Sequence, residues 1–173
     1  MLVGRMIGMV CILAGCAGVL MNWHERKRQQ QAFMGECIRL FSRWQYAVLK
    51  EHLRLYDFIE SYDGRIKEMD DLLQELWHKL ERNSYSSGTV AWQELLQEKR
   101  QILPLGEEAF HILSDAGDAF FGNSREEVLR CTEACRDRME EALVEEKRET
   151  ARRWRVYMPV GMLGGVMLII LLV

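Results

Sequence analysis

Residues that could carry out chemistry are few in this sequence, and they are scattered. None of the histidines lies in an HExxH pattern or at metal-ligand spacing from a cysteine. They are His24, His52, His78 and His111. Cys131 and Cys135 would share one face of a helix, a spacing that permits a metal or redox pair. Because two thiolates alone rarely hold a structural metal, we interpret these cysteines as buried free thiols and expect neither a metal nor another cofactor.

Neighbouring carboxylates are a second candidate, because such a pair can act as general acid and general base. The pairs are Asp70 with Asp71, Glu140 with Glu141, and Glu145 with Glu146. Each lies in a charge-rich helical segment, which is typical of a solvated surface. The sequence also has no glycine-rich loop followed by Lys and Ser or Thr, so it is not expected to bind nucleotide phosphates. We therefore expect no enzymatic activity, and ATP hydrolysis would have to come from a partner.

The acidic residues Asp70 and Asp71 have a second interpretation. The acidic stretch between basic ends could be a docking surface for a basic cytosolic partner. Charge reversal at both positions that left partner binding intact would contradict this hypothesis.

The middle of the chain lies between two apolar segments that are long enough to cross a membrane. Residues 2–21 contain a single charged residue, Arg5, and about 20 apolar residues suffice to cross a hydrocarbon core of ~30 Å. Residues 156–173 contain no charged side chain and would span about 27 Å as a helix. The sequence predicts a transmembrane helix at 1–21, a cytosolic helical domain at 22–155 and a second transmembrane helix at 156–173.

Basic residues next to each apolar segment predict the orientation. They are Arg26, Lys27 and Arg28 after the first segment, and Lys147, Arg148, Arg152, Arg153 and Arg155 before the second. Lys and Arg near a span stay on the cytoplasmic side, so the middle domain is expected in the cytosol of a two-pass cell-membrane protein. The same clusters would attract anionic membrane lipid, by about 1 kcal/mol per basic residue. All 26 acidic residues also lie in the middle, which argues against a nucleic-acid partner.

Small residues occur at GxxxG spacing in both apolar segments. The pairs are Gly4 with Gly8 and Gly161 with Gly165. Glycines at this spacing let membrane helices approach closely and gain dispersion contacts. Glycine is also common in membrane helices without such a role, so helix packing and simple tolerance both remain open. Bulky replacements at Gly161 and Gly165 that left the two spans associating normally would exclude the packing role.

A competing interpretation concerns the first apolar segment. Residues 13–16, Leu-Ala-Gly-Cys, look like the site at which bacterial lipoprotein precursors are cleaved and acylated, here at Cys16. Against this, the apolar run continues from Ala17 to Met21 and a basic cluster follows it, which resists translocation. A second anchor at the C-terminus would also be redundant. The transmembrane helix is the preferred interpretation, with the lipoprotein as an alternative.

The middle domain shows helical periodicity throughout and no sustained alternation, so we predict an all-α bundle. An apolar stripe from Phe33 to Tyr62 occupies one helix or two, and a turn at Asp63 and Gly64 precedes a helix at 66–80. After a loop at 83–88, a short helix is expected at 89–100, and Pro104 is expected in the first turn of the next helix.

A long final helix is predicted from Ser124. Ser124 and Glu127 have capping-box spacing at its start. Its inner stripe comprises Val128, Thr132, Cys135, Met139 and Ala142. Beyond Val144 the segment is almost wholly charged, so we expect a solvated stalk that leads into the second apolar segment.

The plan of the chain resembles a known family. Residues 157–165, Tyr-Met-Pro-Val-Gly-Met-Leu-Gly-Gly, run into an apolar end, and residues 116–118 (Ala-Gly-Asp) precede 123–126 (Asn-Ser-Arg-Glu). These motifs, best matched at 105–127 and 145–173, resemble the stage III sporulation protein AB family. The resemblance implies an endospore former, a domain similar to the cytoplasmic domain of the type II secretion platform protein, and a part in the channel between mother cell and forespore. It also implies a mother-cell cytosolic location near a secretion-type ATPase. No partner-binding residue carries over.

The expected function is therefore that of a non-enzymatic membrane platform subunit. The resemblance implies that it couples a cytosolic secretion-type ATPase to other membrane subunits of the sporulation channel complex. Two alternatives remain: a cell-surface lipoprotein acylated at Cys16, and a membrane-tethered signalling scaffold with no role in sporulation.

Overall fold

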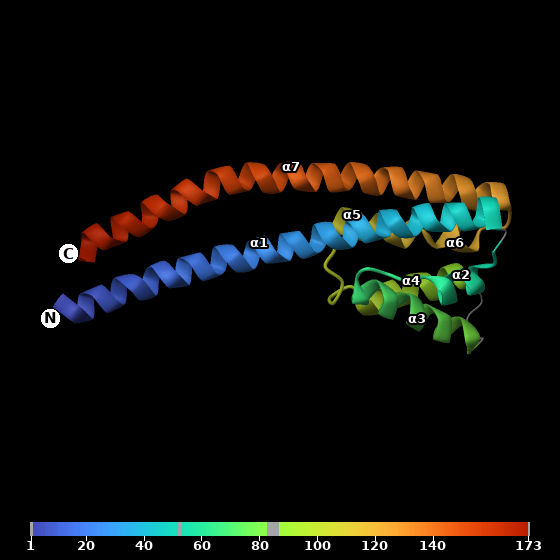
Figure 1. Cartoon of the computed structure of the whole chain (residues 1–173), viewed down its shortest axis with the longest axis horizontal. Helices are drawn as coiled ribbons and strands as arrows, with labels where there is room; N and C mark the ends of the chain where they lie inside the picture. The colour runs from blue at the N-terminus through green and yellow to red at the C-terminus, as the bar shows by residue number, and fades with distance from the viewer. Residues whose placement is uncertain (1, 52, 83–86, 173) are drawn as a thin grey trace. The chain divides into compact units, whose positions relative to one another are not determined.

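The computed structural model describes residues 2–51, 53–82 and 87–172, and every regular element in these ranges is helical (Figure 1). The predicted all-α fold class is confirmed. The chain divides into two compact units. Residues 1–29 and 145–173 form the terminal unit, and residues 30–144 form the domain unit, which is narrower than the predicted domain at 22–155.

The terminal unit consists of the outer parts of two long helices, α1 (Leu2–Tyr46) and α7 (Arg125–Leu172). The two helices are antiparallel here: Lys27 Nζ lies 2.7 Å from Glu146 Oε1, and the rings of His24 and Trp154 are 5.2 Å apart. Pro159 lies inside α7 and removes one backbone hydrogen bond.

The two predicted membrane spans fall in this terminal unit. Where side chains are described, no helix is both long and apolar enough to cross a membrane. Gly4, Gly8, Gly161 and Gly165 lie outside the residues whose side chains are described, so their packing role stays a prediction.

The domain unit is a bundle built from the inner parts of α1 and α7 and the helices between them (Figure 1). These helices are α2 (Leu55–Ser61), α3 (Lys67–Glu81), α4 (Gly88–Lys99), α5 (Glu107–Asp115) and α6 (Gly117–Phe121). A short π-helical segment, η1 (Ala47–Glu51), ends α1, and Arg125 of α7 donates a hydrogen bond to its Leu49 carbonyl at 2.9 Å. The predicted inner stripe of the last helix is buried at all five positions, Val128, Thr132, Cys135, Met139 and Ala142.

Two buried tryptophans join the helices of the core. Trp44 of α1 donates a hydrogen bond to the Ala119 carbonyl and Trp92 of α4 donates one to the Leu113 carbonyl, each at 2.8 Å. Both rings pack against Phe120 of α6, with centroid separations of 6.1 and 5.3 Å. The indole N–H groups are thereby satisfied inside an apolar core.

The start of α7 matches the predicted capping box. Ser124 Oγ accepts a hydrogen bond from the Glu127 amide at 3.1 Å, and Glu127 Oε2 accepts one from the Asn123 amide at 3.1 Å. The carboxylate thus reaches the residue before the N-cap and satisfies one more amide at the helix start.

Two details of the helix predicted to have Pro104 in its first turn are wrong. Pro104 does not begin a helix, since α5 starts at Glu107 with Gly106 as its N-cap. The residue before a proline avoids helical angles, and Leu103 instead closes a turn onto the Lys99 carbonyl at 2.9 Å. The helix is also divided at Ala116 into α5 and α6. There Gly117 packs so closely on α4 that a Cβ atom would lie 2.7 Å from Thr89 Cγ2.

Candidate partner-docking groove

The loop between α2 and α3 is attached to α1 through one buried carboxylate. Glu36 is 4% exposed, and its Oε1 accepts hydrogen bonds from the Tyr62 hydroxyl at 2.8 Å and from the Arg65 amide at 3.0 Å. Arg39 Nε lies 3.5 Å from the same oxygen, and Arg39 also donates to the Asp63 carbonyl. Glu36 therefore fixes the position of residues 62–65, which form one end of a groove.

The pKa of Tyr62 is raised because the side chain is half-buried and its hydroxyl donates to the Glu36 carboxylate. An unfolded tyrosine titrates near pH 10, so the stabilisation is complete below about pH 10 and is lost as the pH rises through the higher folded pKa. We expect the urea midpoint of the wild-type chain to fall between ~pH 9 and ~pH 11 by more than that of Tyr62→Phe. Equal falls in the two proteins would contradict this coupling.

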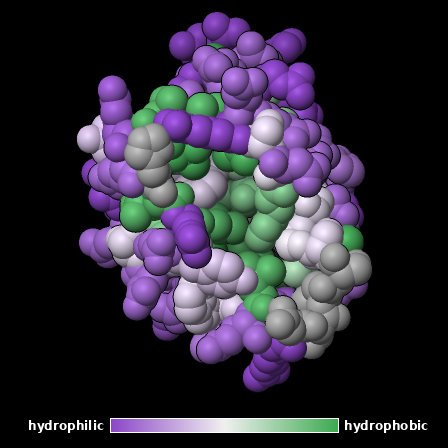
Figure 2. Space-filling model, turned by 90° about the vertical axis from the view of Figure 1, so that its right-hand side faces the viewer, coloured by the Kyte–Doolittle hydropathy of each residue, from purple (hydrophilic) through white to green (hydrophobic). Residues whose placement is uncertain are grey.

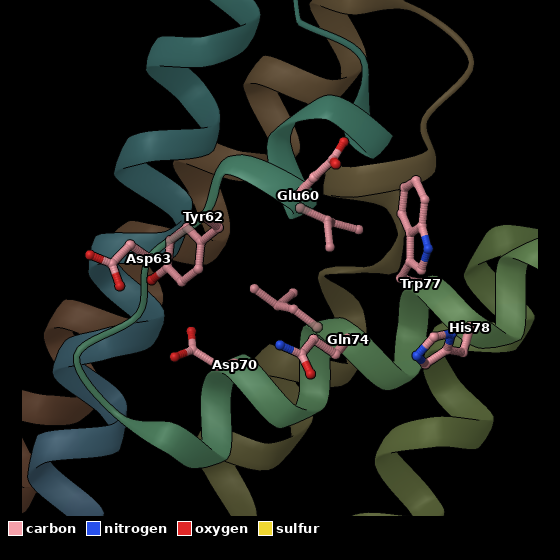
Figure 3. A pocket seen from close by; sticks show the side chains of 9 residues that line it. Glu60, Tyr62, Asp63, Asp70, Gln74, Trp77 and His78 are labelled. Atoms are coloured by element: carbon pink, nitrogen blue, oxygen red, sulfur yellow. The ribbon is translucent and has the colours of Figure 1, made fainter.

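The groove lies between α2 and α3 and has a volume of about 510 Å³ (Figure 3). Its lining residues are Ile59, Glu60, Tyr62, Asp63, Asp70, Leu73, Gln74, Trp77 and His78. In Figure 3 the ribbons of α2 and α3 face each other across it, with Tyr62 and Asp63 toward one end and Trp77 toward the other. We refer to this cavity as the α2–α3 groove.

The α2–α3 groove combines an apolar floor with acidic residues at its edge. Ile59 and Leu73, which line it from opposite helices, are buried, whereas Glu60 and Asp63 are exposed. Asp70 is half-buried, and its Oδ1 accepts a hydrogen bond from the Gly64 amide at 2.9 Å. A site of this kind can receive an apolar group flanked by positive charge.

Of the two acidic residues proposed for docking, the structure places Asp70 in the groove and leaves Asp71 exposed outside its lining. Charge reversal at Asp70 would also remove the hydrogen bond from the Gly64 amide. A loss of partner binding in that variant could therefore arise either from the altered charge or from a displaced loop. The docking role of Asp70 and Asp71 stays a prediction. Sequence reasoning missed Glu60 and Asp63, because they line one cavity with Asp70 only through the fold of the loop between α2 and α3.

The cysteines and histidines form no reactive centre among the residues that the structure describes. Cys37 and Cys135 are buried, and burial raises both pKa values, that of Cys135 to about 11. Such thiols are protonated near neutral pH and react slowly. The His24 ring packs at a tilt against Trp154, and His78 lines the groove. His111 lies 4.0 Å from Glu107, and His52 is outside the described residues. No group of three potential metal ligands converges in the described part of the chain.

The predicted membrane-proximal basic residues lie on the helices of the terminal unit. Arg26, Arg28, Arg152 and Arg155 are exposed. Lys27 pairs with Glu146 across the two helices, and Arg153 pairs with Glu149 at 3.2 Å along α7. Arg26, Arg28, Arg152 and Arg155, which form no ion pair with the described residues, are therefore better candidates than the exposed but paired Arg153 for contact with lipid phosphate.

A second cavity of the domain unit, of about 450 Å³, has a mixed lining: Leu55, Leu80, Phe120 and Phe121 are apolar, whereas Arg54 and Lys79 are charged. Figure 2 shows a face where apolar side chains form a hollow bordered by polar ones.

Comparison with known proteins gives one family and one solved structure. The family model described as stage III sporulation protein AB matches residues 5–173. A solved structure of a stage III sporulation protein AB resembles the chain with a TM-score of 0.54 and 16% sequence identity. The match covers 73% of this chain and 97% of the other, and at this identity it supports the fold alone. No curated protein matches the sequence significantly.

Proposed function

The chain belongs to the stage III sporulation protein AB family, a family of sporulation proteins, and we propose that it is a membrane-anchored platform subunit of the channel complex between mother cell and forespore. The observation that carries this proposal is the extent of the family match. Residues 5–173 include both apolar ends as well as the helical domain, so the whole plan of the chain is that of the family.

Membrane anchoring by residues 1–21 and 156–173 is part of the proposal. Apart from Arg5, both segments are uncharged and of spanning length, and the structure makes each continuous with a helix of the domain unit. Exposed arginines follow the first segment and precede the second, which favours a cytosolic domain unit and attraction to anionic lipid.

Coupling to a mother-cell ATPase is the second part. The sequence has no phosphate-binding loop of its own, so a secretion-type ATPase would have to act on the domain unit from outside. The α2–α3 groove, with its apolar floor and acidic edge, is a candidate contact surface for such a partner. Because the two proposed membrane segments lie in the terminal unit, contacts with other membrane subunits would involve that unit.

Topology is the measurement that tests the proposal first. Gln101 is exposed in the turn after α4, so a cysteine at this position can report on which side of the membrane the domain unit lies. A Gln101→Cys chain whose five native cysteines are replaced by Ala or Val should resist a membrane-impermeant maleimide on intact cells and react after lysis. The cysteine-free chain without the new cysteine is the background control.

Labelling of Gln101→Cys on intact cells would contradict the cytosolic platform and favour the lipoprotein acylated at Cys16. In that case palmitate label should be lost in Cys16→Ser. The signalling scaffold would be favoured by a different pair of results. The domain would be cytosolic in the labelling experiment, and a strain in which the gene is deleted would still form heat-resistant spores.

A further inference from the structure

We propose that the α2–α3 groove binds a basic segment of a partner protein, with one apolar side chain of that segment on its floor and Lys or Arg side chains at Glu60 and Asp63. This inference rests on the proposed function, since it specifies how the domain unit would hold a cytosolic partner.

The floor of the groove is built to receive an apolar group. Ile59 of α2 and Leu73 of α3 are 7% and 3% exposed, so their side chains are already held in the core. Trp77 lines the groove beside them, and its ring is fixed edge-on against Tyr56 with a centroid separation of 5.0 Å. The volume of about 510 Å³ lies in the range of ~300–1,000 Å³ usual for small binding pockets, which suits a few side chains of a partner.

The acidic edge of the groove carries uncompensated charge. Glu60, Asp63 and Asp70 form no ion pair with any residue that the structure describes. Other acidic residues of the same bundle are paired, for example Glu75 with Lys99 at 2.6 Å and Glu98 with Lys79 at 2.8 Å. Positive charge brought to the groove edge would therefore meet carboxylates that are not already neutralised.

Two arginines lie near the Tyr62 end of the groove, and the charge of one of them is already offset. Arg39 and Arg43 lie 5.9 and 5.8 Å from the centre of the Tyr62 ring. Arg39 also lies 3.5 Å from the buried Glu36 carboxylate, so its charge is largely offset by a group that does not line the groove. The groove lining contains three carboxylate side chains, those of Glu60, Asp63 and Asp70, and no lysine or arginine.

The acidic edge and the apolar floor of the groove together favour a cation that is carried on a side chain. Phosphate-containing ligands would be repelled by the three carboxylates. A metal ion needs converging ligands, and no three potential ligands converge among the described residues. Lys and Arg carry their charge at the end of a flexible apolar stem. The charged end can lie at the acidic edge of the groove while a neighbouring apolar residue of the same partner segment occupies the floor.

The test uses the full-length chain in zwitterionic nanodiscs and a fluorescein-labelled peptide, Gly-Lys-Arg-Leu-Lys-Arg-Gly, with binding followed by fluorescence anisotropy. We expect Glu60→Lys with Asp63→Lys to weaken binding about tenfold, because two attractive contacts become repulsive. The matched control, Glu94→Lys with Glu141→Lys, makes the same change in net charge at exposed positions outside the groove and should alter affinity less than about twofold. A peptide with Ser in place of Leu should bind more weakly than the original.

Equal weakening in the two double variants would overturn the inference, because net charge alone would then explain binding. So would equal affinity for the Leu and Ser peptides, or no binding to the wild-type chain. Far-ultraviolet circular dichroism of both variants checks that the bundle is intact. The assay contains neither cells nor an ATPase, so failure here would leave the topology and spore-formation tests of the platform function unaffected.

Discussion

Replacing Trp92 by alanine should lower the free energy of unfolding by about 4 kcal/mol, within the range of ~3–5 kcal/mol for loss of a buried large aromatic side chain. The ring is fully buried, and its Nε1 donates to the Leu113 carbonyl at 2.8 Å. It also packs edge-on against Phe120 at 5.3 Å. Alanine would therefore leave a cavity between α4, α5 and α6. Urea unfolding of the full-length chain, followed by circular dichroism, measures the change.

Two comparisons separate the cavity from the hydrogen bond of Trp92. Trp92→Phe loses the indole donor but keeps most of the apolar volume, so it should cost less than alanine does. Val90→Ala removes a partly exposed side chain from the same helix and should change stability by no more than ~0.5 kcal/mol. Similar effects for Trp92→Ala and Val90→Ala would mean that the tryptophan does not organise this part of the core.

Glu36→Ala should destabilise the domain unit by about 3 kcal/mol, because several groups lose a shared buried partner. The Tyr62 hydroxyl and the Arg65 amide would have no acceptor, and Arg39 would lose its carboxylate. The loop that forms one end of the α2–α3 groove would then be released. Urea unfolding gives the global effect, and the rate of trypsin cleavage after the exposed Arg65 reports the local one.

The trypsin assay distinguishes loop release from general destabilisation. Cleavage after Arg65 should accelerate in Glu36→Ala under conditions where the rest of the chain stays folded. Glu36→Gln keeps an acceptor oxygen but loses the charge, so its effect should lie between those of wild type and alanine. Glu94→Ala, an exposed change on α4, is the control and should leave cleavage unchanged. An unchanged cleavage rate in Glu36→Ala would show that Glu36 does not hold the loop.

Local features of this fold could be predicted from the sequence alone. Apolar spacing identified the buried stripe of α7 from Val128 to Ala142, and the Ser124 and Glu127 pair located the start of that helix. Family membership was also carried by sequence motifs, near Ala116 and in the C-terminal apolar segment. These predictions succeed because helical periodicity and capping depend on residues three or four positions apart.

Contacts between distant residues were decided by the tertiary structure. Gly117, at the boundary between α5 and α6, approaches Thr89 of α4 closely, and no local pattern reveals this contact. Glu36 would be read as a surface residue, yet it is buried because Tyr62 and Arg65 fold back onto it. The acidic edge of the groove arises in the same way, since Glu60 and Asp63 line the same cavity as Asp70 of α3 only because the loop is held against α1. Periodicity shows which face of a helix is apolar, whereas packing between helices decides which side chains meet across them.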